Sequence, residues 1–262
     1  LITEHKAVAV VAPATSGNTT EIVELANKNK VPIVTGSGTA ETVTVAENGK
    51  VNDYAFRTCF IDPFQGIVAA NFASGELKAK NVAIYSDSSS DYAKGLAASF
   101  KTQIEKNGGK VVIHENYVAK DVDFKATLTR IKGANPDFIF IPGYYEEVGL
   151  IVKQARELGL NMPLMGADGW DAPQLVDLAG KEALNNTYIT NHYSSGDPDA
   201  KIQDFVKAFE KEYGSAPNAF HALGYDTVYF IADAIKRAGD DVTGEAIQKA
   251  LAATKDLSLV TG

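Results

Sequence analysis

The stretch NVAIYS (81–86), continued by DSSSDYAKGLAASFKTQIEKNGG (87–109) and KVVIHENY (110–117), decides the fold class. The first six residues form an apolar run that is typical of a buried strand, and residues 92–106 carry apolar residues at helical spacing. Asn107-Gly108-Gly109 is a typical helix end, and residues 110–117 resume the pattern of a strand. The stretch therefore predicts a strand–helix–strand unit with parallel strands.

The same alternation extends in both directions along the chain. Further strands are expected at 7–13, 31–35, 137–142 and 163–166, and further helices at 19–29, 63–77, 124–132 and 146–158. After Tyr193 the pattern is mostly helical, at 197–213, 218–238 and 244–253. The chain is therefore predicted to be an α/β protein whose parallel sheets are covered by helices on both faces.

Two segments look like connections rather than core elements, namely residues 51–62 and 190–196. If both are crossovers, the middle of the chain forms one lobe and its two ends together form the other. A cleft between two lobes is then the default position for a small ligand.

Composition excludes several classes of function. The 262 residues carry a net charge of −8, which disfavours nucleic-acid binding because phosphate contacts need clustered Lys and Arg. One cysteine allows no internal disulfide, and no apolar run approaches the roughly 18 residues of a membrane span. The four histidines are scattered without metal-ligand spacing, and no nucleophile elbow or phosphate-binding loop occurs. We therefore expect no metal, no cofactor and no enzyme activity.

Two loops rich in hydrogen-bond donors follow consecutive strands at one end of the chain. Ala14-Thr15-Ser16-Gly17-Asn18-Thr19 opens a helix, where free backbone N–H groups favour an anion, although ordinary N-capping explains such residues equally well. Ser37-Gly38-Thr39 repeats the arrangement after the next strand. Two such loops at adjacent strand ends favour an anion site more than either does alone.

Polar and aromatic side chains also follow the strands of the middle segment. Asp168 lies in GADGW (166–170), where its carboxylate could neutralise an ammonium group or could instead cap a helix before Pro173. Tyr144 lies in PGYY (142–145) and Tyr92 follows SSSD (88–91), both at strand–helix junctions. Each tyrosine could face a ligand or simply pack against its neighbours.

Taken together, these segments resemble the periplasmic leucine/isoleucine/valine-binding protein family, the type I two-lobed receptors of ABC importers. The resemblance covers essentially the whole chain and rests on VVAPATSGNT, YAFRTCFIDPFQG, NVAIYSDSSSDYAKGL, DVDFKATLTRIKGANPDFIFIPGYYEE, IVKQARELGL, PLMGADGW and FHALGYDTVYFIADAIKRAG. It implies the type I periplasmic-binding-protein fold, with two Rossmann-like lobes and a cleft between them. Lobe one is expected to hold residues 1–61 and 193–262, and lobe two residues 62–192.

The resemblance also implies roles for single residues. Ser16 matches a serine that binds the ligand's α-carboxylate, and the loop Ser37-Gly38-Thr39 matches the loop that holds the carboxylate and the α-ammonium. Asp168 matches an acidic position, often Glu, that pairs with the ammonium. Tyr92 and Tyr144 match tyrosines that lobe two folds over the ligand. Phe220 matches an aromatic residue on the side-chain pocket.

The implied function is capture of an amino acid, with a branched-chain or other apolar side chain, by a monomeric protein that delivers it to a membrane ABC permease. The implied location is extracytoplasmic, either free in a periplasm or lipid-anchored on the outer face of a Gram-positive membrane. Family members begin with two further strand–helix units and end with further strands. We therefore expect this sequence to lack the first part of lobe one and a C-terminal tail.

Two alternatives remain beside this interpretation. A sensor domain of the same fold would bind a ligand in the same cleft but signal to a protein partner. A flavodoxin-like FMN protein is suggested by Thr15-Ser16-Gly17-Asn18-Thr19, which resembles a flavodoxin phosphate loop, although the rest of the chain does not follow that family.

Overall fold

The computed structural model describes residues 1–262, and the chain divides into two compact units. Unit 1 contains Leu1–Phe60 and His192–Gly262, and unit 2 contains Ile61–Asn191. These boundaries lie one residue from the expected lobe boundaries at 61/62 and 192/193. That the two units act as separate lobes stays a prediction.

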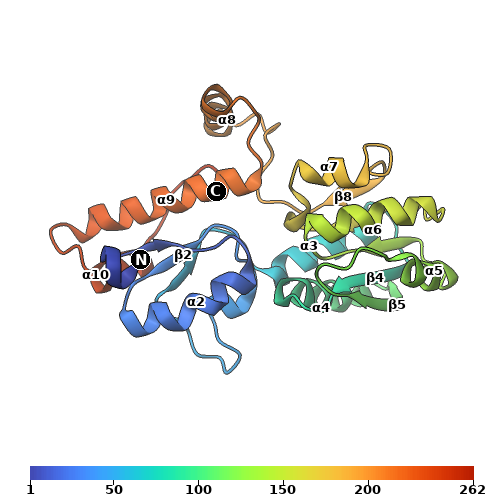
Figure 1. Cartoon of the computed structure of the whole chain (residues 1–262), viewed down its shortest axis with the longest axis horizontal. Coiled ribbons are helices and arrows are strands. Elements are labelled where there is room, and N and C mark those ends of the chain that lie inside the picture. Colours follow the sequence, from blue (N-terminus) through green and yellow to red (C-terminus); the bar gives the residue numbers. More distant parts are fainter. The chain divides into compact units, whose positions relative to one another are not determined.

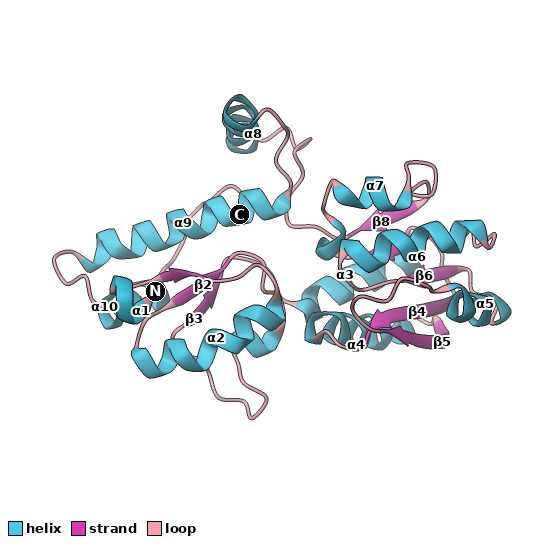
Figure 2. Cartoon of the chain, viewed as in Figure 1, coloured by secondary structure: helices cyan, strands magenta, loops and turns pink.

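Unit 2 is built on a five-stranded parallel sheet in the order β5-β4-β6-β7-β8 (Figure 2). Its elements follow one another as α3 (Asp62–Gly75), β4 (Asn81–Asp87), α4 (Asp91–Lys106), β5 (Lys110–Tyr117), α5 (Lys125–Gly133), β6 (Phe138–Phe140), α6 (Tyr145–Glu157), β7 (Leu164–Gly166), the 3-10 turn η2 (Asp168–Trp170), α7 (Gln174–Ala179) and β8 (Thr187–Ile189). The alternation predicted from the sequence is confirmed here, and β8 is a strand that the sequence analysis missed.

Both faces of this sheet are buried, which explains its continuous apolar strands. Along β4, Val82 and Ile84 pack with α3 and α4, while the alternate residues Ala83 and Tyr85 pack with the opposite cluster around α5, α6 and α7. Figure 1 shows α4 and α6 on opposite sides of the strands. Because successive side chains of a strand point to opposite faces of the sheet, β4 contributes to two separate cores.

Unit 1 contains a smaller parallel sheet in the order β1-β2-β3. Its elements are α1 (Ile2–His5), β1 (Val10–Val11), α2 (Ser16–Asn29), β2 (Ile33–Thr35), the 3-10 turn η1 (Glu41–Val43), β3 (Ala55–Arg57), α8 (Ala200–Tyr213), α9 (Ala219–Ala238) and α10 (Gly244–Ala252). Ile33 packs with α2 and the adjacent Val34 packs with α9 and α10, so that helices cover both faces, as Figure 1 shows for α2 and α9.

Three sequence-based expectations need correction in unit 1. Residues 51–62 are not only a connection, because β3 lies within them and pairs with β2. The strand expected at 7–13 is regular only at Val10–Val11, and the helix expected from residue 19 already begins at Ser16. β3 is short and only partly buried, so it lacks the continuous apolar run that marks the equally short β2. A donor-rich loop resembles a helix start without marking its first residue.

None of the helices has both the length and the apolar character that crossing a membrane requires.

Candidate functional site

The first polar cluster lies in unit 1, at the carboxyl ends of β1 and β2. Ser16 is the first residue of α2 and is 1% exposed, and its Oγ accepts a hydrogen bond from the backbone N–H of Ala40 at 3.1 Å. Because an accepting hydroxyl still carries its own proton, Ser16 can donate to an anion at this helix N-terminus. The N-cap residue Thr15 makes no side-chain capping bond, so ordinary capping does not account for the loop.

The loop after β2 is fixed by a fully buried threonine. Thr35 Oγ1 donates to the Pro13 carbonyl at 2.9 Å and accepts the N–H groups of Ser37 and Gly38 at 3.3 and 2.9 Å. A Cβ at Gly38 would lie 2.9 Å from Thr35 Cγ2, so only glycine fits without a shift. Ser37 Oγ donates to the Ala14 carbonyl at 2.7 Å, which leaves its oxygen to accept from a donor such as an ammonium.

Thr39 stands out within this loop. Its side chain is fully buried, and its hydroxyl oxygen has no hydrogen-bond partner. Buried polar side-chain atoms are nearly always paired, because leaving one unpaired costs about 1–3 kcal/mol. The hydroxyl of Thr39 is therefore well suited to a ligand, for which it can both donate and accept.

Arg57, at the end of β3, is a contributor that the sequence analysis missed. Its guanidinium donates to the carbonyls of Gly38 and Ala40 at 2.7 and 3.0 Å, and to Thr44 Oγ1 at 2.8 Å. It thereby fixes both ends of the Gly38–Ala40 loop and places a permanent positive charge next to it. The residue was overlooked because residues 51–62 were interpreted as a connection, although a lone charge in an apolar strand was a usable signal.

Phe220 is the second residue of α9 and is half-buried. One turn further along, the carbonyl of Leu223 lies against Gly36, where a Cβ would come within 3.0 Å of it. The N-terminal part of α9 therefore lies against the loop that follows β2. The role of Phe220 in a side-chain pocket stays a prediction.

The second polar cluster lies in unit 2 and is centred on Asp168, at the carboxyl end of β7. Asp168 is 2% exposed, and its Oδ1 accepts from Tyr92 Oη at 2.7 Å and from Gln65 Nε2 at 2.9 Å. The N-capping alternative is wrong, because Ala167 is the N-cap of η2, Pro173 is the N-cap of α7, and neither helix start has a side-chain capping bond. The structure thus brings Asp168 and Tyr92, which are 76 residues apart in the sequence, into one cluster.

Tyr92 and Tyr144 lie against each other in this cluster. Their rings stack with centroids 4.9 Å apart and planes 17° apart. Burial, with a smaller contribution from the charge of Asp168, raises the pKa of Tyr92 well above its ordinary value of 10.0, so the hydroxyl stays protonated. That hydroxyl donates to Asp168 and accepts from the N–H of Gly169 at 2.9 Å. Contact of either tyrosine with a ligand stays a prediction.

Gln65, on α3, completes the cluster and was also missed. Its Oε1 accepts from the backbone N–H of Asp168 at 3.1 Å and from Thr190 Oγ1 at 2.8 Å. Gln65 is 1% exposed. A single glutamine in a helix has no spacing or chemistry that marks it in a sequence, so only the tertiary structure shows this role.

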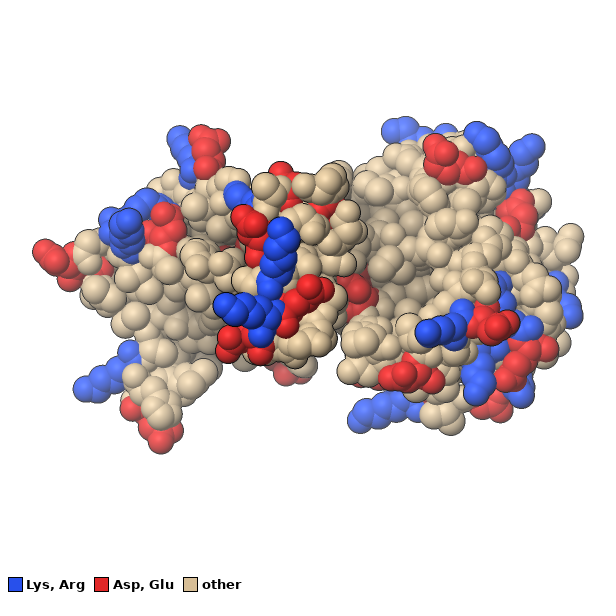
Figure 3. Space-filling model, turned by 90° about the horizontal axis from the view of Figure 1, so that it is seen from above, with Lys and Arg blue, Asp and Glu red and all other residues tan.

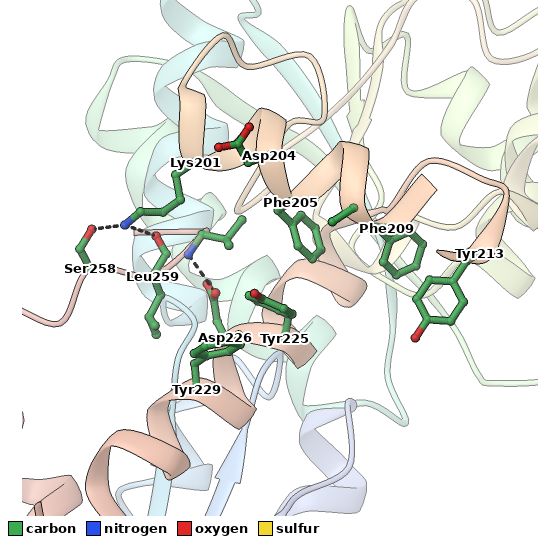
Figure 4. A pocket seen from close by; sticks show the side chains of 12 residues that line it. Lys201, Asp204, Phe205, Phe209, Tyr213, Tyr225, Asp226, Tyr229, Ser258 and Leu259 are labelled. Carbon is green, nitrogen blue, oxygen red and sulfur yellow. Dashed lines mark hydrogen bonds between the residues drawn. The ribbon is translucent and has the colours of Figure 1, made fainter. Parts of the chain in front are cut away.

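A separate concavity in unit 1 contains none of the predicted site residues. It lies between α8, α9 and the C-terminal segment, and Figure 4 shows aromatic rings such as Phe205 and Tyr225 along it. Asp226 is fully buried, and its carboxylate accepts the N–H groups of Val260 and Thr261 at 2.9 and 2.8 Å. The charge of Asp226 therefore anchors the C-terminal segment.

Surface charge offers no extended site of one sign on the face seen in Figure 3, where Lys and Arg are interspersed with Asp and Glu. No group of three or more potential metal ligands gathers in residues 1–262. The two buried polar clusters are thus the strongest candidates for function.

Comparison with known proteins shows the family of the chain. The family model described as periplasmic binding protein matches residues 1–262. The chain belongs to the periplasmic binding protein family. Within this family, it is 32% identical over 254 residues to the Leu/Ile/Val-binding protein BraC3 of Rhizobium johnstonii, covering 97% of this chain and 67% of the relative. It is 29% identical over 231 residues to the leucine-, isoleucine-, valine-, threonine- and alanine-binding protein of Pseudomonas aeruginosa, covering 88% of this chain and 60% of that relative.

Solved structures show the fold that this periplasmic binding protein shares. The leucine-binding protein LivK of Thermotoga maritima matches with a TM-score of 0.92 and 35% identity over 100% of this chain and 73% of that one. The branched-chain amino acid transporter substrate-binding protein LivJ of Streptococcus pneumoniae, in complex with isoleucine, matches with a TM-score of 0.91 and 41% identity over 100% of this chain and 72% of that one. The expected type I periplasmic-binding-protein fold is confirmed.

The chain spans 60 to 67% of the length of these two curated relatives.

Proposed function

We propose that this chain captures a branched-chain or other apolar amino acid for an ABC importer. The observation that carries the proposal is the complementary chemistry of the two clusters. One cluster offers hydroxyls beside a helix N-terminus, and the other is centred on a buried carboxylate. An amino-acid zwitterion needs both, because an unpaired charge out of water is costly.

In this proposal, Ser16 and Thr39 donate to the α-carboxylate. Ser37, whose proton is committed to Ala14, accepts from the α-ammonium, and Asp168 neutralises its charge. Gly38 lets the loop approach the ligand closely, and Tyr144 and Phe220 enclose the side chain. The isoleucine bound by the 41% identical relative has this combination of a zwitterion and an apolar side chain.

The remaining parts of the proposal concern the whole protein. Binding without catalysis fits relatives that are named as binding proteins, and delivery to a membrane permease fits those named as parts of transporters. We place the protein outside the cytoplasm, free in a periplasm or lipid-anchored, and we expect a monomer. A flavin-binding alternative has no support, because the relatives that match nearly the whole chain are amino-acid-binding proteins.

Thermal unfolding of this chain with each common amino acid tests the proposal. A ligand at a hundred times its dissociation constant should add about 2.7 kcal/mol to the free energy of unfolding. We expect a clear rise in melting temperature with leucine, isoleucine or valine and none with lysine or glutamate. An unchanged melting temperature with every amino acid would contradict the proposed function.

A further inference from the structure

The carboxamide of Gln65 holds Asp168 at two points. Nε2 donates to the carboxylate at 2.9 Å, and Oε1 accepts from the backbone N–H of the same residue at 3.1 Å. Two contacts to one residue fix both its backbone and its side-chain orientation. A carboxylate held in this way has lost its rotational freedom before any ligand arrives, so ligand binding does not incur the entropy cost of ordering this side chain.

The same carboxamide is tied to the chain segments that border unit 2. Gln65 lies five residues after Phe60, the last residue of the first segment of unit 1, and its Oε1 also accepts from Thr190, two residues before unit 1 resumes at His192. Asn191, the last residue of unit 2, donates through Nδ2 to Asp171 Oδ2 at 2.9 Å, just after η2. The chain passes between the two units twice, at residues 60/61 and 191/192. Residues close to each of these two passages thus form hydrogen bonds with the loop that carries Asp168.

Gln65 has no other evident role that would require an amide at its position. It is 1% exposed in the first turn of α3, where an apolar residue would fill the same space. A buried amide is retained at lower cost when its donor and acceptor are both satisfied, as they are here by Asp168 and Thr190. Its chemistry therefore serves the Asp168 cluster.

We propose that Gln65 is the positioning residue of the amino-acid site, which fixes the carboxylate of Asp168 for the ligand's α-ammonium and links it to both chain passages. This inference rests on the proposed function. It implies that Gln65 contributes to affinity only for ligands that carry an ammonium group. Gln65 itself does not touch the ligand.

The test compares leucine with 4-methylpentanoate, which has the same carbon chain and carboxylate but no amino group. Gln65→Met keeps the length and volume of the side chain and removes all three hydrogen bonds. We expect it to weaken leucine binding about tenfold or more, in line with the loss of a hydrogen bond to a charged group, and to leave 4-methylpentanoate binding within about twofold. Gln103→Met, at an exposed amide of α4, is the matched control and should change neither.

Two further variants keep the test decisive. Thr190→Val removes only one of the contacts of Gln65 and should weaken leucine binding in the same direction but by less. In an Asp168→Asn background, Gln65→Met should have under a twofold effect on leucine, because the charge to be positioned is gone. If 4-methylpentanoate binds the unmodified chain too weakly to be measured, this double-variant comparison still tests whether Gln65 acts through Asp168.

The outcomes separate the inference from the proposed function. Equal weakening of both acids by Gln65→Met, or additive effects of Gln65→Met and Asp168→Asn, would overturn the positioning role alone. Unchanged leucine binding in Gln65→Met, with an intact circular dichroism spectrum, would do the same. If the unmodified chain binds leucine but Asp168→Asn binds it equally well, the ammonium assignment fails first and the positioning role fails with it.

Discussion

The hydroxyl of Tyr92 donates to Oδ1 of Asp168 at 2.7 Å, so an aromatic residue in the first turn of α4 holds the carboxylate that follows β7. Both side chains are 2% exposed. The contact is a hydrogen bond from a neutral donor to a charged acceptor, which is roughly twice as strong as one between neutral groups. It keeps the charge of Asp168 solvated by the protein and leaves Tyr92 committed to Asp168 and Gly169.

The charge of Asp168 should decide amino-acid affinity. Asp168→Asn keeps the size of the side chain and removes the charge that pairs with the α-ammonium. Truncating one member of a buried charge pair typically costs about 2–5 kcal/mol, so we expect leucine to bind about 30-fold more weakly or worse, as measured by titration calorimetry. Asp177→Asn, an exposed carboxylate on α7, should bind leucine normally. Equal affinities of the two variants would rule out the ammonium role.

Thr39 and Thr35 are both fully buried and lie four residues apart. Replacing each with valine should nevertheless have different effects on the free energy of unfolding. Thr39→Val removes a hydroxyl with no partner in the protein, so the free energy of unfolding should stay the same or rise. Leucine affinity should fall by about tenfold if this hydroxyl binds the carboxylate. Chemical denaturation with and without leucine measures both effects.

Thr35→Val is the matched control. It removes a hydroxyl that makes three hydrogen bonds and leaves two buried N–H groups unpaired, so we expect a loss of about 1–3 kcal/mol in the absence of ligand. A loss of equal size in Thr39→Val would contradict the assignment of Thr39 to the ligand.

Tyr117 should make the protein sensitive to alkali. Its hydroxyl is buried without a partner, and burial raises its pKa well above 10.0. The unfolded chain releases this proton near pH 10 while the folded protein still retains it, so stability is fully present below pH 10 and falls as the pH rises further. Tyr117→Phe should be neutral or stabilising at pH 7 and should flatten the decline in melting temperature above pH 10. A decline as steep as that of the unmodified chain would refute this explanation.

Arg156 should be irreplaceable by lysine. Its guanidinium donates to the carbonyls of five residues, namely Leu160, Met162, Ala183, Asn185 and Asn186. A lysine has three donors and no planar fork, so Arg156→Lys should lower the free energy of unfolding by about 1–3 kcal/mol in urea. Arg130→Lys, at an exposed ion pair with Glu115, should have little effect. Similar midpoints for the two variants would show that the carbonyl contacts contribute nothing.

The sequence by itself determined the order of strands and helices from α3 to β7 in unit 2, because elements such as β4 and α4 are long enough to express their periods of 2 and 3.6. It also indicated Ser16, Ser37, Thr39 and Asp168, since polar residues directly after apolar strands meet at the carboxyl edge of a parallel sheet. The short strands β3 and β8 escaped recognition because they are partly exposed, whereas the equally short β6 and β7 are continuous buried apolar runs.

Only the tertiary structure decided how the polar residues are used. Gln65 and Asp168 lie 103 residues apart, and no local pattern links a helical glutamine to a carboxylate in the turn after β7. Likewise, the sequence indicated Ser37 and Thr39 alike, but the structure commits the proton of Ser37 to Ala14 and leaves the hydroxyl of Thr39 unpartnered. The physical reason is that hydrogen bonding depends on the distances between atoms brought together by folding, whereas sequence patterns report the burial and spacing of residues along one element.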